Sequence, residues 1–450
     1  MSHLSVAKFG GTSVANYSAM QSCANIVIAD PNTRVVVLSA SAGVTNLLVA
    51  LANGCEEPER NKLLNEVRQI QENILTALKD DSRVRPKIEA LLANITSLAE
   101  AANLATSLAL TDELISHGEM MSSLIFVEVL RELQIEATWL DVRTIVATNS
   151  HFGKAAPNDE QTRQNCDNLL KPLIERGELV ITQGFIGRDE QGKTTTLGRG
   201  GSDYSAALLA EVLNAQDVLI WTDVAGIYTT DPRIVSNAQR IDTMSFSEAA
   251  EMATFGAKVL HPATLLPAVR SNIPVYVGSS KAPQDGGTWV TRNPQPRPTF
   301  RAIALRRDQT LLTLSSLNML YAQGFLANIF TILAKHKISV DTITTSEVSV
   351  ALTLDKTGSA SSGASLLSEE LLRELSEFCT VKVDVGLSLI ALIGNELHTA
   401  SGVAKRIFET LDAYNIRMIS YGASTNNICL LADSDKADDI VQVLHRSLFE

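Results

Sequence analysis

Two glycine-rich segments, at residues 8–13 (KFGGTS) and 198–203 (GRGGSD), constrain the fold of this chain most strongly. The first follows an apolar run over residues 4–9 and precedes a helical pattern at residues 20–28. The second precedes a helical pattern at residues 206–213. Both segments are therefore predicted to join a strand to a helix, which is typical of an α/β fold.

Each segment also combines paired glycines with a cation, Lys8 in one and Arg199 in the other. Backbone N–H groups approach a ligand closely where no Cβ intrudes, and a cation neutralises phosphate charge. The helix N-termini that follow add a further attraction for anions. One glycine loop alone is usually a turn, but two in one chain predict an enzyme that uses a nucleotide.

Composition sets the broad class. With 450 residues, of which 45% are hydrophobic, the chain can form two or three domains. A net charge of −12 argues against nucleic acid or a membrane surface as partner. Five scattered cysteines predict reduced thiols, and neither a signal peptide nor an apolar run of transmembrane length is evident. We therefore expect a cytoplasmic protein.

Uniformly apolar runs recur along the first part of the chain, with helical patterns between them. They cover residues 34–39, 136–140, 179–184, 218–221 and 273–277. Such strands are typical of a mainly parallel sheet covered by helices on both faces, a three-layer sandwich. Residues 57–133 show only helical patterns. We expect a first domain over residues 1–280 and, because prolines and glycines accumulate, a linker over residues 281–299.

After this segment the pattern predicts two ferredoxin-like modules with the order βαββαβ. The second cycle lacks one strand, and a spare strand immediately after the expected linker is predicted to complete it. The first module is then inserted within the second. The expected bounds are residues 307–385 for the first module, and residues 300–306 plus 386–450 for the second.

One segment imitates a P-loop. Residues 187–194 match the pattern G-x-x-x-x-G-K-[ST]. A P-loop must lead directly into a helix, but the following residues are β-branched and then glycine. Asp189 and Glu190 would also lie where phosphate oxygens should be. A hairpin turn is therefore the better interpretation.

Several motifs together resemble the amino acid kinase family, and within it the aspartokinases. They are residues 8–13 (KFGGTS), 196–203 (TLGRGGSD), 221–233 (WTDVAGIYTTDPR) and 255–262 (FGAKVLHP), with the paired C-terminal modules similar to ACT domains. Residues 316–320 (SLNML) and 338–350 (ISVDTITTSEVSV) resemble the lysine-sensitive monofunctional members most. The resemblance covers essentially the whole chain.

The resemblance implies phosphorylation of the side-chain carboxylate of L-aspartate by ATP, giving 4-phospho-L-aspartate and ADP. This carboxylate is ionised at neutral pH, so no general base is needed. Catalysis should consist of positioning and charge neutralisation. We expect Mg²⁺ to be held largely by the phosphates, with no dedicated protein metal site.

The resemblance also implies roles for individual residues. Lys8 should contact the transferred phosphoryl group, Gly10 and Gly11 should donate N–H groups, and Asp203 should orient the lysines or reach Mg²⁺ through water. The expected aspartate site comprises Thr45, Glu119, Arg199 and Ser202, with Ser39 and Ser41 as weaker candidates. The expected ATP site comprises Thr222, Asp223, Tyr228, Arg233 and Lys258.

The first C-terminal module is expected to bind L-lysine as a feedback inhibitor. Asp341 and Glu347 supply acidic groups for its two ammonium groups. The resemblance adds the surrounding contacts Met319, Phe325, Leu326, Ser339, Val340, Thr345 and Ser346. Tyr321 lies in the same region. Such modules pair across subunits, so we expect a homodimer or tetramer.

Two alternatives stay open. The chain can be another amino acid kinase, acting on glutamate, acetylglutamate or a nucleoside monophosphate. It can also be a non-catalytic amino-acid sensor that uses only its C-terminal half. The tandem modules argue against the first alternative, and the intact residues Lys8, Arg199, Ser202 and Asp203 argue against the second.

Overall fold

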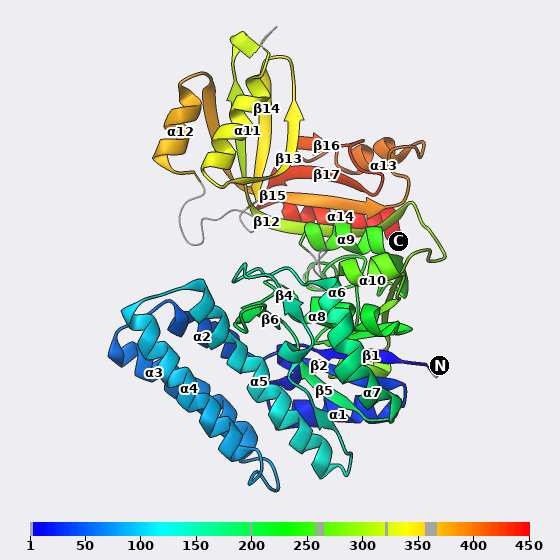
Figure 1. The fold of residues 1–450 in the computed structure, drawn as a ribbon. Coiled ribbons are helices and arrows are strands. Elements are labelled where there is room, and N and C mark those ends of the chain that lie inside the picture. Colours follow the sequence, from blue (N-terminus) through cyan, green and yellow to red (C-terminus); the bar gives the residue numbers. More distant parts are fainter. Residues whose placement is uncertain (1–2, 199, 257–259, 261–264, 320–322, 356–366) are drawn as a thin grey trace. The chain divides into compact units, whose positions relative to one another are not determined.

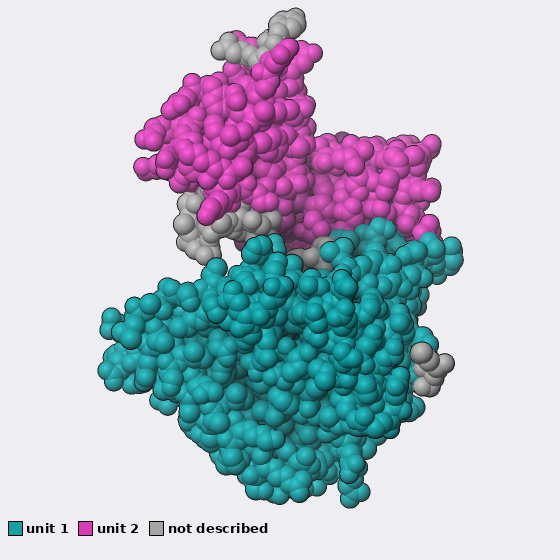
Figure 2. Space-filling view, in the orientation of Figure 1, with its two compact units in different colours: residues 1–227, 240–250, 258–295 teal, residues 228–239, 251–257, 296–450 magenta. Residues whose placement is uncertain are grey.

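The computed structural model describes residues 3–198, 200–256, 260, 265–319, 323–355 and 367–450. The chain divides into two compact units (Figure 2). Unit 1 comprises Met1–Ile227, Arg240–Ala250 and Lys258–Gln295, and unit 2 comprises Tyr228–Gln239, Glu251–Ala257 and Pro296–Glu450.

Unit 1 is built on an eight-stranded sheet with the order β3-β5-β2-β1-β8-β10-β11-β9 (Figure 1). Its strands are β1 (Ser5–Phe9), β2 (Thr33–Leu38), β3 (Thr138–Trp139), β5 (Val180–Gln183), β8 (Asp217–Thr222), β9 (Thr243–Ser245), β10 (Val275–Ser279) and β11 (Gly287–Thr291). Only the β10–β11 pairing is antiparallel. The predicted mainly parallel sheet is therefore confirmed.

Helices cover both faces of this sheet. One face carries α8 (Gly201–Leu213) with α10 (Leu266–Ser271), and the other carries α1 (Tyr17–Ala29) with α5 (Leu108–Glu132). The predicted helical tract over residues 57–133 forms α3 (Glu57–Leu75), α4 (Arg85–Leu104) and α5, and α2 (Val44–Ala52) precedes it. The edge of unit 1 adds α6 (Asp159–Asn165), a π-helical turn (Cys166–Leu170) and α7 (Lys171–Glu175). No helix in the described part of the chain is both long and apolar enough to cross a membrane.

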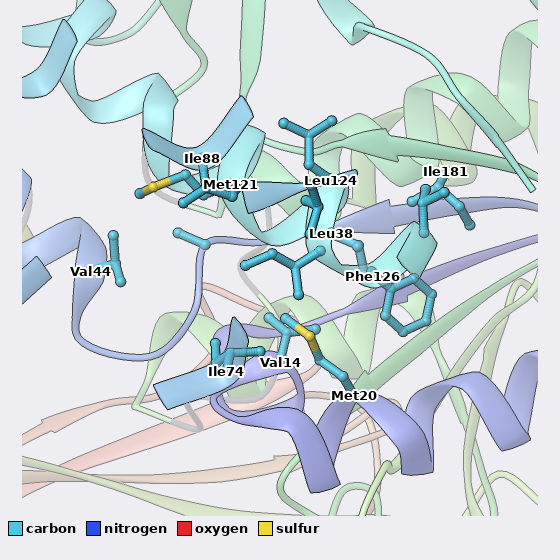
Figure 3. Close-up of a cluster of buried hydrophobic side chains, with 14 of the residues drawn as sticks. Val14, Met20, Leu38, Val44, Ile74, Ile88, Met121, Leu124, Phe126 and Ile181 are labelled. Carbon is cyan, nitrogen blue, oxygen red and sulfur yellow. The ribbon is translucent and has the colours of Figure 1, made fainter. Parts of the chain in front are cut away.

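The main core of unit 1 lies between the sheet and helices α1 to α5 (Figure 3). Leu38 from β2 and Ile181 from β5 meet Met20 from α1 and Phe126 from α5 there. Side chains alternate between the two faces of a strand, so Phe9 enters this core while Lys8 points to the face that α8 covers. Strand β1 thus supplies packing on one face and a charge on the other.

The segment that resembles a P-loop is a hairpin, as predicted. Strands β6 (Ile186–Asp189) and β7 (Thr194–Thr196) pair in antiparallel fashion, and β4 (Ala147–Thr148) joins them in a three-stranded sheet. The Asp189 carboxylate accepts N–H groups from Gln191 at 3.0 Å and Lys193 at 2.8 Å. It closes the turn instead of leaving space for phosphate.

The expectation of a plain linker over residues 281–299 is wrong. Strand β11 lies within this segment and pairs with β9 and β10 of the main sheet, where Val290 is fully buried. Gly287 has Val277 O only 2.2 Å from the position of a Cβ, so the strand approaches closely because this residue is a glycine. Sequence reasoning missed this short strand because prolines and glycines accumulate around it.

Unit 2 contains a six-stranded sheet with the order β13-β14-β12-β15-β17-β16. Its strands are β12 (Phe300–Ser315), β13 (Ser339–Thr345), β14 (Ser349–Asp355), β15 (Thr380–Gly394), β16 (Ile416–Ser420) and β17 (Asn427–Asp433). Both long strands, β12 and β15, run through two modules. The first half of β12 pairs with the last half of β15, and the second half of β12 pairs with the first half of β15. This is the pairing that an inserted first module requires.

Each module has its own core. Helices α11 (Phe325–Lys335) and α12 (Glu369–Ser376) pack on one core, and α13 (Val403–Thr410) and α14 (Ala437–Phe449) pack on the other. Helix α9 (Phe246–Thr254) contributes its last turns to unit 2, where Glu251 accepts hydrogen bonds from Ser424 Oγ at 2.8 Å and Asn427 Nδ2 at 2.7 Å.

We predict that Leu392→Ala in β15 lowers the free energy of unfolding of unit 2 by about 2–5 kcal/mol, because Leu392 is fully buried in the second-module core. Ile419→Ala in β16 is the control, since Ile419 is 39% exposed. Urea denaturation followed by circular dichroism measures both changes. Equal losses in the two variants would contradict the assignment of this core.

Candidate active site

The site lies at the carboxyl ends of adjacent parallel strands. Strands β5, β2, β1 and β8 are neighbours in the sheet, so the loops that follow them converge at one edge. Ligands bind at this edge in open α/β sheets. Both glycine-rich segments and the loops after β2 and β8 lie there.

Lys8 and Asp203 join the two glycine-rich segments. Lys8 Nζ lies 2.6 Å from Asp203 Oδ1, and the side chains are only 10% and 14% exposed. Lys8 comes from β1, and Asp203 from the first turn of α8, where a carboxylate is favoured by the helix dipole. The pair places a cation between the two loops that we predicted to bind phosphate.

The two glycines of the first loop differ in what they offer. Gly11 lies so close to the loop after β2 that a Cβ would be 2.8 Å from Ala40 O. The N–H of Gly10 is already donated to the carbonyl of Trp221 at 3.0 Å. The expectation that the Gly10 N–H binds phosphate is therefore wrong, because sheet pairing between β1 and β8 extends to this residue.

Glu119 is the most strongly perturbed acid at the site. It lies on α5, is 3% exposed, and accepts the N–H of Ala40 with Oε1 at 3.1 Å. Within the described residues, its Oε2 has no hydrogen-bond partner. Burial raises the pKa of Glu119 to about 8, although the Ala40 N–H and the charge of Lys8 oppose the shift. The free site therefore contains a buried oxygen that a cationic ligand group can satisfy.

Two further residues bring α5 to the loop after β2, and sequence reasoning missed both. A Cβ on Gly118 would be 2.7 Å from Ala40 Cβ, so glycine permits the close approach. Ser122 Oγ donates to Ser39 O at 2.7 Å. Their proximity to Glu119 in the sequence was the only available signal.

A buried carboxylate, Asp112, supports the second glycine-rich segment. It accepts the N–H and the hydroxyl of Thr196, both at 2.8 Å, and the N–H of Gly153 at 2.9 Å. Burial raises the pKa of Asp112 in spite of these bonds. Asp112 thus holds the end of β7 immediately before the loop. Sequence reasoning missed it because its partners lie far along the chain.

The backbone of this loop explains its glycines. Gly198 and Gly200 have φ values of 76° and 74°, in the left-handed region that favours glycine. A Cβ on Gly184, at the end of β5, would be only 2.6 Å from Ser202 Cβ. The loop therefore packs directly on the end of β5. Arg199 lies outside the described residues.

The remaining aspartate-site residues lie at the same edge. Thr45 is half-buried in the first turn of α2, and Ser202 is half-buried in the first turn of α8. Ser41 is 2% exposed, and its Oγ has no hydrogen-bond partner within the described residues. Ser39 offers its carbonyl to Ser122.

The residues expected to bind ATP are distributed between the units. In unit 1, Thr222 ends β8 and Asp223 follows it, and Thr222 Oγ1 donates to the Asp223 carboxylate at 3.2 Å. Tyr228 and Arg233 belong to unit 2. The side chain of Arg233 is 89% exposed and pairs with Asp231 at 2.6 Å. Lys258 lies outside the described residues.

The expected lysine-binding residues lie in the short turn after β12, at the start of α11, at the two ends of β13, and in the turn between β13 and β14. Asp341 is not an exposed charge, because its side chain is 10% exposed and pairs with Arg306 at 2.9 Å. Glu347 is exposed in the turn. Most of the other expected contacts are exposed or half-buried: Met319, Phe325, Leu326, Ser339, Val340, Thr345 and Ser346. Tyr321 lies outside the described residues.

Among the described residues, no group of three or more His, Cys, Asp or Glu side chains could hold a metal ion. At the site itself, Asp203 pairs with Lys8. The arrangement is suited to an anionic ligand and a cationic ligand group side by side.

Family comparisons agree with this geometry. Residues 3–279 match the model of the amino acid kinase family, and residues 390–448 match an ACT domain model.

Individual relatives show to which group within the amino acid kinase family the chain is most similar. Lysine-sensitive aspartokinase 3 of Escherichia coli strain K12 is 62% identical over 450 residues and 100% of both chains. Aspartokinase 3, chloroplastic, of Arabidopsis thaliana is 34% identical, covering 99% of this chain and 81% of the relative. The crystal structure of E. coli aspartokinase III in complex with aspartate and ADP (R-state) superposes with a TM-score of 0.89 at 61% identity over 100% of both chains. The chain therefore belongs to the amino acid kinase family, and within it to the aspartokinases.

The pKa of Glu119 predicts a pH dependence of stability. Between the ordinary value of 4.5 and about 8, the unfolded chain loses the Glu119 proton while the folded chain keeps it. Stability therefore falls as pH rises through this window, by at most about 1.4 kcal/mol per pH unit. We expect Glu119→Gln to lack this contribution, so wild type should lose more stability than the variant from pH 5 to pH 8 in urea titrations. Parallel pH profiles for the two proteins would refute the raised pKa.

Proposed function

We propose that this protein catalyses the ATP-dependent phosphorylation of the side-chain carboxylate of L-aspartate, giving 4-phospho-L-aspartate, and that L-lysine inhibits it. This is the first step toward lysine, threonine and methionine. The observation that carries the proposal is the Lys8–Asp203 pair, which unites the two glycine-rich segments beside the buried Glu119. The 62% identity to a lysine-sensitive aspartokinase supports the choice of substrate and effector.

The reaction requires two anions to meet. An oxygen of the aspartate side chain attacks the γ-phosphorus of ATP, the bond from this phosphorus to the β,γ-bridging oxygen breaks, and ADP leaves. The nucleophile needs no deprotonation at neutral pH. The barrier is lowered by holding the reactants in line and by neutralising the charge on the transferred group.

Lys8 supplies this neutralisation. Its ammonium group is held at 2.6 Å by Asp203 and is nearly shielded from solvent, so it is fixed in place before the reactants bind. A preorganised charge in a site of low dielectric constant stabilises the transition state without reorganisation. Asp203 acts as the positioning partner of the lysine. Mg²⁺ would accompany ATP and be held by its phosphates.

Glu119 selects the amino acid. Its unpartnered Oε2 is placed to accept the α-ammonium group of aspartate, which would lower the pKa of Glu119 and restore its charge. We assign Arg199 to the α-carboxylate because a guanidinium binds carboxylates in a bidentate manner. Thr45, Ser41 and Ser202 supply hydroxyl groups for the remaining hydrogen bonds.

We assign ATP binding to Thr222, Asp223, Tyr228, Arg233 and Lys258, and lysine binding to the first ACT-like module. The E. coli aspartokinase III structure with lysine and aspartate (T-state), with a TM-score of 0.87 at 61% identity, supports the effector. We further propose that the kinase domain extends beyond residue 280 to include β11, that the inserted module spans residues 307–385, and that the protein self-associates into a dimer or tetramer through the ACT-like modules. Five unpaired cysteines suit a cytoplasmic enzyme.

Replacement of Lys8 tests the catalytic assignment. We expect Lys8→Ala to reduce kcat by about 100- to 1,000-fold, the usual cost of removing one preorganised transition-state donor. The assay is ATP- and Mg²⁺-dependent formation of acyl phosphate from L-aspartate, trapped with hydroxylamine. Lys193→Ala is the control, because Lys193 is exposed in the hairpin turn that resembles a P-loop. Loss of activity in Lys193→Ala but not in Lys8→Ala would reverse the assignment.

The effector assignment is tested by inhibition. Lysine should abolish the activity of wild type, and threonine should not. We expect Glu347→Gln and Asp341→Asn each to raise the half-inhibitory lysine concentration at least about fivefold, within the range of known allosteric couplings. Glu377 is an exposed carboxylate at the end of α12, so lysine should inhibit the control variant Glu377→Gln as strongly as it inhibits wild type. Unchanged inhibition of an Asp341→Asn, Glu347→Gln double variant would exclude this site.

A further inference from the structure

The segment Tyr228–Gln239 belongs to the kinase family match by sequence but to unit 2 by packing. Val235 is 9% exposed and is part of the hydrophobic core of the second module, while Ile234 and Ala238 pack against that core. The same core contains Ile440, Val441 and Leu444 of α14. A stretch that carries two residues of the proposed ATP site is therefore anchored on a regulatory helix.

Hydrogen bonds reinforce this anchor. His445 Nε2 lies 2.9 Å from Thr229 Oγ1, and Gln442 Nε2 donates to Ile234 O at 3.1 Å. Ile303, in β12 of the same module, donates its N–H to Thr229 O at 2.7 Å. The body of the segment is thus held at Thr229 and at Ile234.

Thr229 is the centre of the arrangement. Its N–H donates to Gln239 O at 2.8 Å, and its Oγ1 accepts the Gln239 N–H at 3.0 Å. These bonds close the two ends of the segment on each other. Tyr228 precedes Thr229 directly, so the orientation of the backbone at Tyr228 depends on how Thr229 is held.

His445 is built to accept the threonine proton. It is fully buried and stacks on Phe449 with ring centroids 4.9 Å apart. Its Nδ1 lies 3.5 Å from Glu450 Oε1, which favours a proton on Nδ1 and leaves Nε2 as the acceptor. Burial lowers the pKa of His445, so the neutral imidazole is retained near pH 7. The Thr229 hydroxyl therefore donates to Nε2.

We propose that His445 and Gln442 of α14, acting through Thr229 and Ile234, are positioning residues for ATP. They fix the segment that presents Tyr228 and Arg233 to the nucleotide. The inference rests on the proposed function, since it assumes that these two residues bind ATP. It assigns to the second ACT-like module a role in nucleotide affinity that is separate from lysine binding by the first.

The test is a set of variants of the full-length chain. Thr229→Val removes the hydroxyl group and keeps the side-chain shape, and Thr229→Ser restores the hydroxyl group. We expect Thr229→Val to raise the KM for ATP at least about twofold, because it loses the hydrogen bonds of the hydroxyl group to both His445 and Gln239, with the KM for aspartate unchanged. Thr229→Ser should behave like wild type. Gln442→Ala removes a more exposed contact to the same segment and should raise the KM for ATP in the same direction.

Hydrogen–deuterium exchange supplies a readout that does not depend on catalysis. We expect faster exchange at residues 228–239 in Thr229→Val and Gln442→Ala, but not in Glu409→Gln, an exposed control on α13. Unchanged exchange and ATP affinity in both variants would overturn the proposal, as would an equal rise in the KM for both substrates. If wild type makes no acyl phosphate from aspartate, the proposed function fails, whereas exchange and calorimetric ATP affinity still decide this inference.

Discussion

The ion pair between Lys8 and Asp203 is the interaction on which the site depends. It connects a strand at the centre of the sheet with the first turn of a helix far along the chain, and it is nearly closed to solvent. A buried charge without a partner is costly, so the pair also requires both glycine-rich segments to fold against each other. The same two side chains meet this structural requirement and carry the proposed catalytic role.

The surroundings of this pair control which charges the site can hold. Glu119 is kept largely protonated by burial, with one oxygen satisfied by the Ala40 N–H and the other unpartnered among the described residues. An amino acid that brings its own cation supplies the missing partner. Under the proposed function, substrate specificity follows from a desolvated acid that becomes stable as an anion only when the ligand is bound.

Unit 2 contains more of the chain than the two ACT-like modules alone. Strands β12 and β15 each run through both ACT-like modules, so the two modules share one continuous sheet. The segment Tyr228–Gln239 and the end of α9 pack with the second module, although the kinase family model includes both. Residues of the kinase family match are therefore part of the packing of unit 2.

The sequence by itself determined the parallel sheet, the helical tract, the two βαββαβ modules and the hairpin that resembles a P-loop, because these follow from local patterns and from residues with restricted backbone conformations. Its resemblance to the family also predicted Lys8, Glu119 and Asp203 as site residues, and the structure brings Lys8 and Asp203 within 2.6 Å of each other. Only the tertiary structure decided that the Gly10 N–H is used by Trp221, that β11 lies in the expected linker, and that Asp112 supports the second loop. These depend on partners far apart in the chain, which local periodicity does not encode.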